Sequence, residues 1–292
     1  MDHARATGRQ APRRATTQED VTMTDPDAVP TELMRTAELV AREAGDLVRE
    51  ALTGTVAAAE TKSSGVDLVT EVDRAAEALI RRRLAELRPD DGVLGEEEGS
   101  LAGSSGLTWV VDPIDGTTNF VYGLPSYSVS VAVARAEGED PYGWPLLAGA
   151  VHAPATGETW TAAAGHGAFA DGRRLTVTGA PALATSLLGT GFAYTADRRS
   201  GQARILTAVL PTVRDIRRLG SAAVDLCLVA EGRLDVFYEQ YLNPWDMAAG
   251  ALVVTEAGGV VHRLGSGEDG LTVAGPAALV TELLEVLRPA LG

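Results

Sequence analysis

The sequence predicts a layered α/β or α+β fold. Its strand patterns fall into two groups, and stretches with helical periodicity lie before, between and after them. The chain has 292 residues, of which 45% are hydrophobic and 22% charged, proportions typical of a globular protein with a sizeable core. No repeat of 20–50 residues and no clear linker follows residue 30, which favours a single domain over residues 31–292.

A tail and two helices are expected first. Residues 1–30 have no apolar period and are predicted to be a disordered tail, within which Met23 is an alternative start. Apolar residues at helical spacing predict a helix from Thr31, with an inner stripe of Leu33, Ala37, Val40, Ala44 and Leu47. A second helix is expected over residues 71–87, with its arginines outside and an inner face of Val72, Ala75, Leu79 and Leu84.

Most of the strand signals lie in the middle of the chain. Residues 109–111 form a short apolar run, and residues 128–135 alternate small residues with valine, which predicts a half-buried strand. An Asp171-Gly172 hairpin turn and further strands over residues 146–151, 158–163, 234–238 and 259–263 complete the set. Helices are expected over residues 221–231, 245–257 and 276–287.

Composition excludes several classes of protein. The single cysteine, Cys227, rules out an internal disulfide and a cysteine-built metal site, and we expect it to fill the core of a cytoplasmic protein. No run approaches the roughly 18 apolar residues of a spanning helix, so no membrane partner is expected. The net charge of −15 argues against nucleic acid as the main ligand.

The densest chemical signal is residues 109–120, WVVDPIDGTTNF. A strand ends in Asp112, Pro113 fixes a turn, and Asp115 follows, so both carboxylates and the Ile114 carbonyl can point at one place. These hard oxygen donors suit Mg²⁺ or Mn²⁺. The backbone N–H groups that follow Asp115 could hold phosphate if they open a helix. A shorter Asp-Gly turn of this kind is often only structural.

Three further acidic positions qualify as parts of a site, and each has an alternative interpretation. Glu96 lies in the Gly95–Gly99 run GEEEG, which alone is typical of a solvated charge run. Asp246 follows Pro244-Trp245, where a carboxylate is also a good helix cap. Asp73 alone would be interpreted as a cap or a surface acid.

Taken together, residues 62–73, 95–97, 112–120 and 245–259 resemble the inositol monophosphatase family, in its order and spacing. Residues 122–125 and 217–239 are most similar to its bacterial, actinobacterial-like members. The resemblance covers residues 31–290. It implies a layered α/β/α/β/α sandwich of the inositol monophosphatase and fructose-1,6-bisphosphatase type. It also implies a Mg²⁺-dependent phosphomonoesterase that holds two or three Mg²⁺, accepts Mn²⁺, is inhibited by Li⁺ and forms a homodimer.

The resemblance also assigns roles to residues. Asp73 and Thr117 would orient and deprotonate a water molecule, with Glu96 as a third catalytic residue. The implied metal ligands are Glu96, Asp112, the Ile114 carbonyl, Asp115 and Asp246. The implied substrate contacts are Asp115, Gly116, Thr117, Ser221, Ala222, Glu239 and Asp246.

The substrate implied by the resemblance is inositol 1-phosphate or a related polyol or sugar phosphate. Glu239 could accept hydrogen bonds from two neighbouring hydroxyls, although a surface acid at a strand end is the alternative. Histidinol phosphate, fructose 1,6-bisphosphate, NADP and 3′-phosphoadenosine nucleotides remain alternative substrates. A regulatory protein that kept the fold without catalysis remains the alternative outside enzymes.

Overall fold

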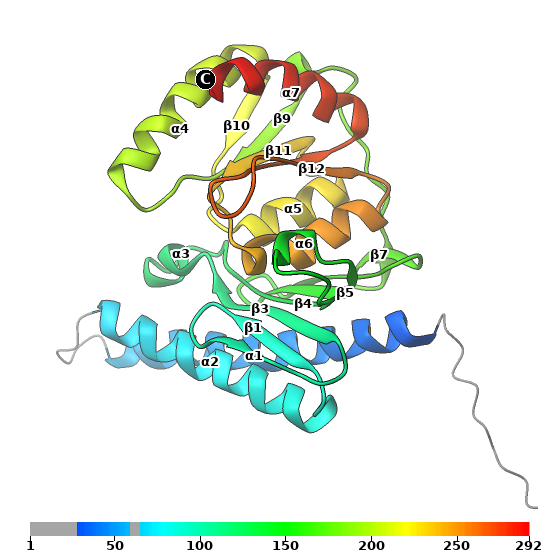
Figure 1. Cartoon of the computed structure of the whole chain (residues 1–292). Coiled ribbons are helices and arrows are strands. Elements are labelled where there is room, and N and C mark those ends of the chain that lie inside the picture. The colour runs from blue at the N-terminus through cyan, green and yellow to red at the C-terminus, as the bar shows by residue number, and fades with distance from the viewer. Residues whose placement is uncertain (1–27, 59–64, 292) are drawn as a thin grey trace, which may run out of the picture.

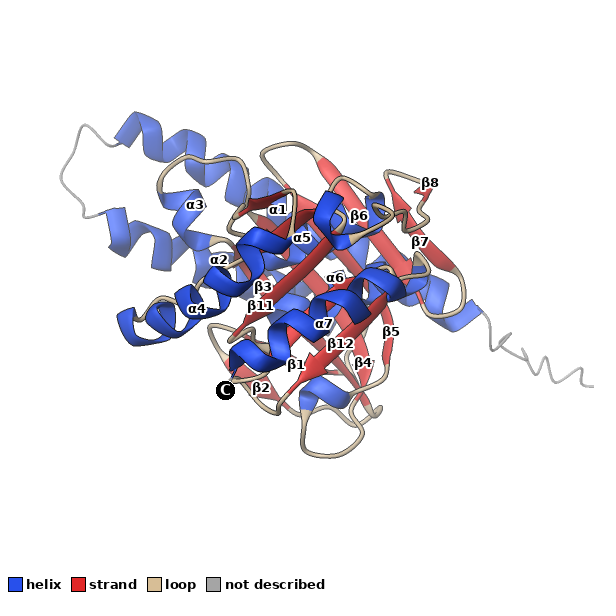
Figure 2. Cartoon of the chain, turned by 90° about the horizontal axis from the view of Figure 1, so that it is seen from above, coloured by secondary structure: helices blue, strands red, loops and turns tan. Residues whose placement is uncertain are grey.

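The computed structural model describes residues 28–58 and 65–291, which stack in five layers (Figure 1). Helices α1 (Ala28–Ala58) and α2 (Gly65–Leu87) cover one face of an eight-stranded sheet. Helices α5 (Ala222–Glu231) and α6 (Pro244–Glu256) fill the space between this sheet and a five-stranded one. Helices α4 (Ala196–Val209) and α7 (Ala277–Leu291) lie side by side on the outer face of the second sheet (Figure 2). The predicted α/β/α/β/α sandwich is confirmed.

The first sheet has the strand order β2-β1-β3-β4-β5-β6-β7-β8, and only β1 and β3 pair in parallel. Its strands are β1 (Gly92–Gly95), β2 (Gly99–Leu101), β3 (Leu107–Asp115), β4 (Ser128–Arg135), β5 (Leu146–Ala153), β6 (Glu158–Ala163), β7 (Gly167–Ala170) and β8 (Arg173–Arg174). The short helix α3 (Thr117–Val121) follows β3 directly. At the β7–β8 turn Asp171 and Gly172 both have positive φ, so the predicted hairpin turn is confirmed.

The second sheet has the order β10-β9-β11-β13-β12, with β9 parallel to both of its neighbours. Its strands are β9 (Leu187–Thr190), β10 (Asp215–Arg217), β11 (Val236–Gln240), β12 (Val260–Leu264) and β13 (Leu271–Gly275). Three 3₁₀ turns, Pro141–Gly143, Leu183–Thr185 and Leu210–Thr212, complete the described elements. None of the described helices is long and apolar enough to cross a membrane.

Strand β4 is buried on both faces, so the prediction of a half-buried strand was wrong. Val129, Val131 and Val133 pack toward α1 and α2, whereas Ala132 packs toward α5 and α6. The alternation in the sequence is therefore an alternation of size between two covered faces. Small residues on one side allow the central helices to approach the sheet closely.

The N-terminal helices follow the predicted stripes with two corrections. In α1 four of the five predicted stripe residues are buried and Leu47 is half-buried, and residues 28–30, assigned to the tail from the sequence, already begin this helix. In α2 Ala75 is exposed, because the buried stripe runs through Ala76 and Ile80 instead. The same stripe carries Glu77. Arg81 forms an ion pair with it and is therefore largely buried, not on the solvated face expected from the sequence.

Candidate active site

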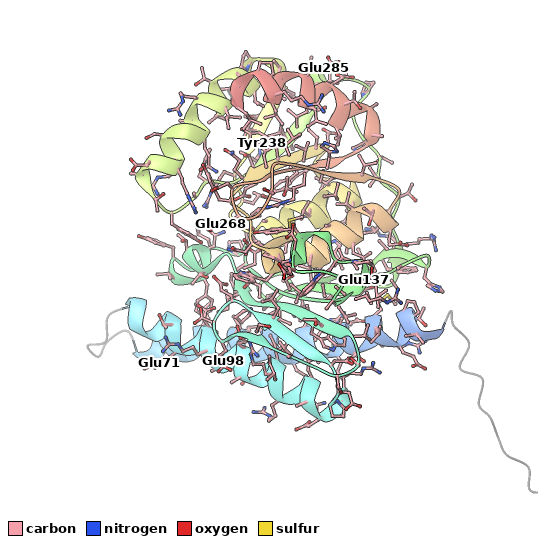
Figure 3. All side chains as sticks on the ribbon, in the orientation of Figure 1. Glu71, Glu98, Glu137, Tyr238, Glu268 and Glu285 are labelled. Carbon is pink, nitrogen blue, oxygen red and sulfur yellow. The ribbon has the colours of Figure 1, made fainter. Side chains whose placement is uncertain are left out.

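A cavity of about 330 Å³ is lined by β3 of the first sheet, the start of α3, β11 of the second sheet and the start of α6. Nine of the predicted site residues line it: Glu96, Asp112, Ile114, Asp115, Gly116, Thr117, Ala222, Glu239 and Asp246. Asp73 and Ser221 do not line it, although both are buried. In Figure 3 the labelled Glu268, another lining residue, lies between the second sheet and α3.

An irregularity at the end of β3 presents its two carboxylates. Asp112 pairs with Ser130 of β4 and Asp115 with Ser128, so three steps along β3 match two along β4. This bulge lies at Pro113, where a missing N–H costs the sheet no hydrogen bond. The Ile114 N–H donates to Asp112 Oδ1 at 3.0 Å. The carboxylates therefore belong to a buried strand end instead of the turn expected from the sequence.

The N-terminus of α5 holds Asp115. The Ser221 hydroxyl donates to Asp115 Oδ2 at 2.6 Å, and the Ala223 N–H donates to the same oxygen at 2.7 Å. Ser221 also caps the helix, because its Oγ accepts the Val224 N–H at 3.2 Å. Burial raises the pKa of Asp115 to about 6, and the bonds from Ser221 and α5 oppose that rise.

Asp246 is a helix cap and a cavity residue at once. Its Oδ2 accepts the Asn243 N–H at 2.7 Å, one half of a capping box at the start of α6. The same carboxylate lines the cavity, where burial and then the charge of Asp115 raise its pKa. The two interpretations of this residue from the sequence are therefore compatible.

Asp112 lies at the centre of a group of mutually repelling carboxylates. The side chains of Glu96 and Asp246 line the same cavity, and each interacts electrostatically with Asp112. Burial and then the charge of Glu96 raise the pKa of Asp112 well above its ordinary value. Glu96 reaches solvent at the cavity mouth, yet desolvation and then the charge of Glu97 raise its pKa to about 7. A bound cation would relieve the repulsion among these carboxylates.

Asp73 lies behind this group on α2. It is 5% exposed, and its Oδ1 has no hydrogen-bond partner. Burial, followed by the charges of Glu97 and Glu96, raises its pKa to about 8. The Thr117 hydroxyl donates to the Ile114 carbonyl at 3.0 Å, and no direct hydrogen bond joins Asp73 and Thr117. The predicted catalytic pair thus consists of two separately held groups.

These residues fit a hard divalent cation by their chemistry. The donors are carboxylate and carbonyl oxygens, several of the carboxylates repel one another, and one buried oxygen of Asp73 has no partner. Within the described residues, no group of three or more His, Cys, Asp or Glu side chains already has the spacing of a metal centre. Side-chain adjustments around a bound cation would therefore be needed.

Gly116 joins β3 to α3 at a position that only glycine fits. Its φ is +94°, and a Cβ there would lie 2.9 Å from the backbone oxygens of Gly220 and Ser126. Asn119 fixes the same junction, because its Nδ2 donates at 2.6 Å to the carbonyl oxygens of Ser126 and Leu219. Gly116 and Thr117 therefore line the cavity at the start of a helix, as the sequence predicts.

Glu239 approaches the cavity from the second sheet, which excludes its interpretation as a surface acid. A Cβ on Gly191 would lie 2.1 Å from Glu239 Oε1, so the carboxylate packs directly on the glycine backbone. Burial and then the charge of Asp225 raise the pKa of Glu239. Cys227, in the helix below, is fully buried as expected.

Sequence reasoning missed the outer rim of the cavity. The Arg198 guanidinium lies over the Tyr241 ring, 4.4 Å from its centroid, and forms an ion pair with Glu268. Tyr194 and Arg218 line the same side. Arg198 lies in α4, Tyr194 in the segment just before it, and the others in loops elsewhere in the chain, so the rim follows no local spacing rule. The positive φ of Tyr241, 68°, is the feature that marks it as unusual, and it appears only in the structure.

Comparisons with known proteins agree with this architecture. The profile described as inositol monophosphatase family matches residues 30–288. An inositol-1-monophosphatase of Mycobacterium leprae is 44% identical over 288 residues, which cover 91% of this chain and 97% of that one. The Nus factor SuhB of Pseudomonas aeruginosa is 38% identical over 88% of this chain and 96% of its own length. The solved structure of Mycobacterium tuberculosis SuhB superposes with a TM-score of 0.77 at 42% identity, over 90% of this chain and 99% of that chain.

Proposed function

Because the chain belongs to the inositol monophosphatase family and is an enzyme of this phosphatase class, we propose that it is a Mg²⁺-dependent phosphomonoesterase. Its proposed substrate is inositol 1-phosphate or a related polyol phosphate. The observation that carries the proposal is the cavity itself. Crowded carboxylates on β3 and α6 face the Glu239 carboxylate on β11 across one space.

Glu96, Asp112, Asp115, Asp246 and the Ile114 carbonyl would hold the metal ions, proposed as two or three Mg²⁺ with Mn²⁺ as a substitute. Bound there, the cations would supply Lewis-acid polarisation of the phosphate and acidify the attacking water. Inhibition by Li⁺ belongs to the same proposal.

The chain's own groups would position the reactants. Asp73 offers an unpartnered buried oxygen that can accept a proton from water, and the Thr117 hydroxyl next to Ile114 can orient that water. The Gly116 and Thr117 N–H groups would bind phosphate oxygens. Glu239 would accept hydrogen bonds from hydroxyls of the leaving group, while Ser221 keeps Asp115 in place.

A panel of phosphomonoesters tests the proposal. We expect Mg²⁺-dependent phosphate release that is fastest with inositol 1-phosphate, compared with fructose 1,6-bisphosphate, histidinol phosphate, NADP and a 3′-phosphoadenosine nucleotide. Excess EDTA should stop the reaction and added Mg²⁺ should restore it. Full turnover in EDTA would reject the metal, and a faster reaction with another ester would replace the substrate.

A second candidate is a regulatory role, which the resemblance to proteins named Nus factor SuhB favours. If no ester in the panel releases phosphate with Mg²⁺ present, that result would support the regulatory role.

We further propose a small phosphomonoester as the partner, a cytoplasmic location and a homodimer, the last by family resemblance alone. Size-exclusion chromatography with light scattering tests the dimer.

A further inference from the structure

The turn between β1 and β2 carries three consecutive glutamates, and the structure gives them different surroundings. Glu96 lines the cavity. The Glu97 carboxylate lies 3.7 Å from Arg74 of α2, and the Glu98 carboxylate, labelled in Figure 3, lies 3.5 Å from Arg81. Among the described residues, no lysine or arginine pairs with Glu96. Helix α2 therefore holds two of the three acids and leaves the third for the site.

A buried acid on α2 fixes the backbone of this turn. The Glu77 side chain is 0% exposed. One of its oxygens accepts the Glu97 N–H at 2.8 Å and the other accepts the Glu98 N–H at 3.0 Å. Because a buried carboxylate is costly unless it is paired and hydrogen-bonded, these contacts account for its place in the interior. They also fix the two residues that follow Glu96.

Arg81 completes the arrangement from one helical turn further along α2. Its Nη2 lies 2.7 Å from Glu77 Oε1 and donates to the Gly99 carbonyl at 2.6 Å. At the start of the turn, a Cβ on Gly95 would lie 2.4 Å from Glu77 Oε1. The carboxylate thus packs directly on the backbone at Gly95, while Arg81 holds the last residue of the turn.

We propose that the Glu77–Arg81 ion pair is a positioning device that fixes the direction in which Glu96 points into the site. Neither side chain lines the cavity, so both would act through the turn. The inference rests on the proposed function, in which Glu96 binds a cation. Loss of a residue that orients a metal ligand typically weakens metal binding about tenfold to a hundredfold.

The same helix offers a matched control. Arg83 lies two residues beyond Arg81 and joins α2 to α1, with its Nε 2.6 Å from Glu43 Oε2. Both arginines are partly buried and both pair with a glutamate. Arg83 makes no contact with the β1–β2 turn, so its loss reports the effect of weakening α2 packing alone.

The test is Mn²⁺ binding to the substrate-free full chain, measured by calorimetry. Arg81→Gln removes the charge that balances Glu77. Gly95→Ala keeps every charge and forces Glu77 away from the turn. We expect both variants to bind Mn²⁺ about tenfold to a hundredfold more weakly than the unchanged chain. Arg83→Gln should bind Mn²⁺ as the unchanged chain does. Circular dichroism should show a cooperative melt for every variant.

Several outcomes would overturn the inference. Unchanged Mn²⁺ affinity in both Arg81→Gln and Gly95→Ala would show that Glu96 needs no such support. An equal loss in Arg83→Gln would show that helix packing in general sets the affinity. If the unchanged chain bound no Mn²⁺, the proposed metal site and this inference would both be rejected, whereas equal binding in all chains rejects the inference alone.

Discussion

Glu239 can be separated from the phosphate chemistry because it lies on β11 of the second sheet, whereas Asp112 and Asp115 lie on β3 of the first. Glu239→Gln keeps the size of the side chain and one acceptor but loses the charge that strengthens bonds from hydroxyls. Hydrogen bonds to charged groups are worth about 1.5–3 kcal/mol, so kcat/KM for inositol 1-phosphate should fall roughly tenfold to a hundredfold.

The control for Glu239→Gln is p-nitrophenyl phosphate, whose leaving group offers no polyol hydroxyls for Glu239 to bind. Its hydrolysis should barely change. Equal damage to both substrates would make Glu239 a structural or metal-linked residue. No damage to either would point to a phosphomonoester that other side chains recognise.

Asp112 is the residue whose charge should matter most for catalysis and least for folding. Burial and nearby carboxylates raise its pKa, so the folded chain without metal disfavours its charged form. Asp112→Asn should therefore keep the melting temperature of the metal-free chain while phosphate release falls by orders of magnitude. Circular dichroism melts and a phosphate assay check both halves. An active Asp112→Asn variant would contradict the central role given to this carboxylate.

At the scale of elements, Asp91 ties the end of α2 to β3. It accepts hydrogen bonds from Arg88 Nε at 2.8 Å, Ser105 Oγ at 2.6 Å and Trp109 Nε1 at 3.0 Å. Burial alone would raise the pKa of Asp91, but these bonds outweigh it and hold the pKa below its ordinary value of 3.8. A lowered pKa stabilises the fold above pH 3.8, and this contribution is lost as the pH falls through the lower folded value.

Asp91→Asn should therefore lower the free energy of unfolding by about 1–3 kcal/mol at pH 7, because it replaces a charged acceptor and weakens the hydrogen bonds that buried donors make to it. The difference between the variant and the unchanged chain should shrink below pH 3.8. Urea titrations at neutral and acidic pH measure it. Asp90→Asn, a change at the exposed neighbouring acid, is the matched control and should have little effect. A difference that persists unchanged into acid would contradict the role of ionised Asp91.

Elements with a strong local pattern could be predicted from the sequence, and those fixed by tertiary contacts could not. The apolar stripe of α1 and the Asp171-Gly172 turn are both present. Helix α4 was not predicted, because its buried residues are Gln202, Ile205 and Val209, too few for a clear apolar face. The inner face of α2 was misplaced because two of its buried residues are acids.

The candidate site likewise divides into residues marked by a local sequence pattern and residues that only tertiary contacts bring together. The chemistry of residues 109–120 was visible as an unusual run of carboxylates, glycine and hydroxyls. Which glutamate of residues 96–98 serves the site was known only by resemblance, because the distinction depends on Glu77 and Arg81 of another element. Arg198, Tyr241 and Glu268 meet only in the folded chain, from three separate segments.

At the scale of the whole molecule, the N-terminal segment is expected to contribute little. The predicted disordered tail, residues 1–30, lies outside the described residues except for residues 28–30. Residues 1–22 have no apolar face, so a chain that starts at Met23 should melt within a degree or so of the full chain and hydrolyse substrate equally well. A melting temperature lower by many degrees would show that this segment packs against the domain.

The last prediction is that cations stabilise the whole fold, because of the net charge of −15 and the cluster of carboxylates around Asp112. An ion that binds the folded chain alone stabilises it by about 2.7 kcal/mol at a concentration of 100 Kd. For a domain of this size that corresponds to a rise of about 5–10 °C in the melting temperature.

Screening of surface charge would also raise the melting temperature, without any metal site. Melts in MgCl₂ should therefore be compared with melts in NaCl of equal ionic strength, and with Asp112→Asn in both salts. We expect the rise with MgCl₂ in the unchanged chain alone. An equal rise in NaCl, or in the variant, would assign the effect to screening and remove the thermodynamic support for a specific metal site.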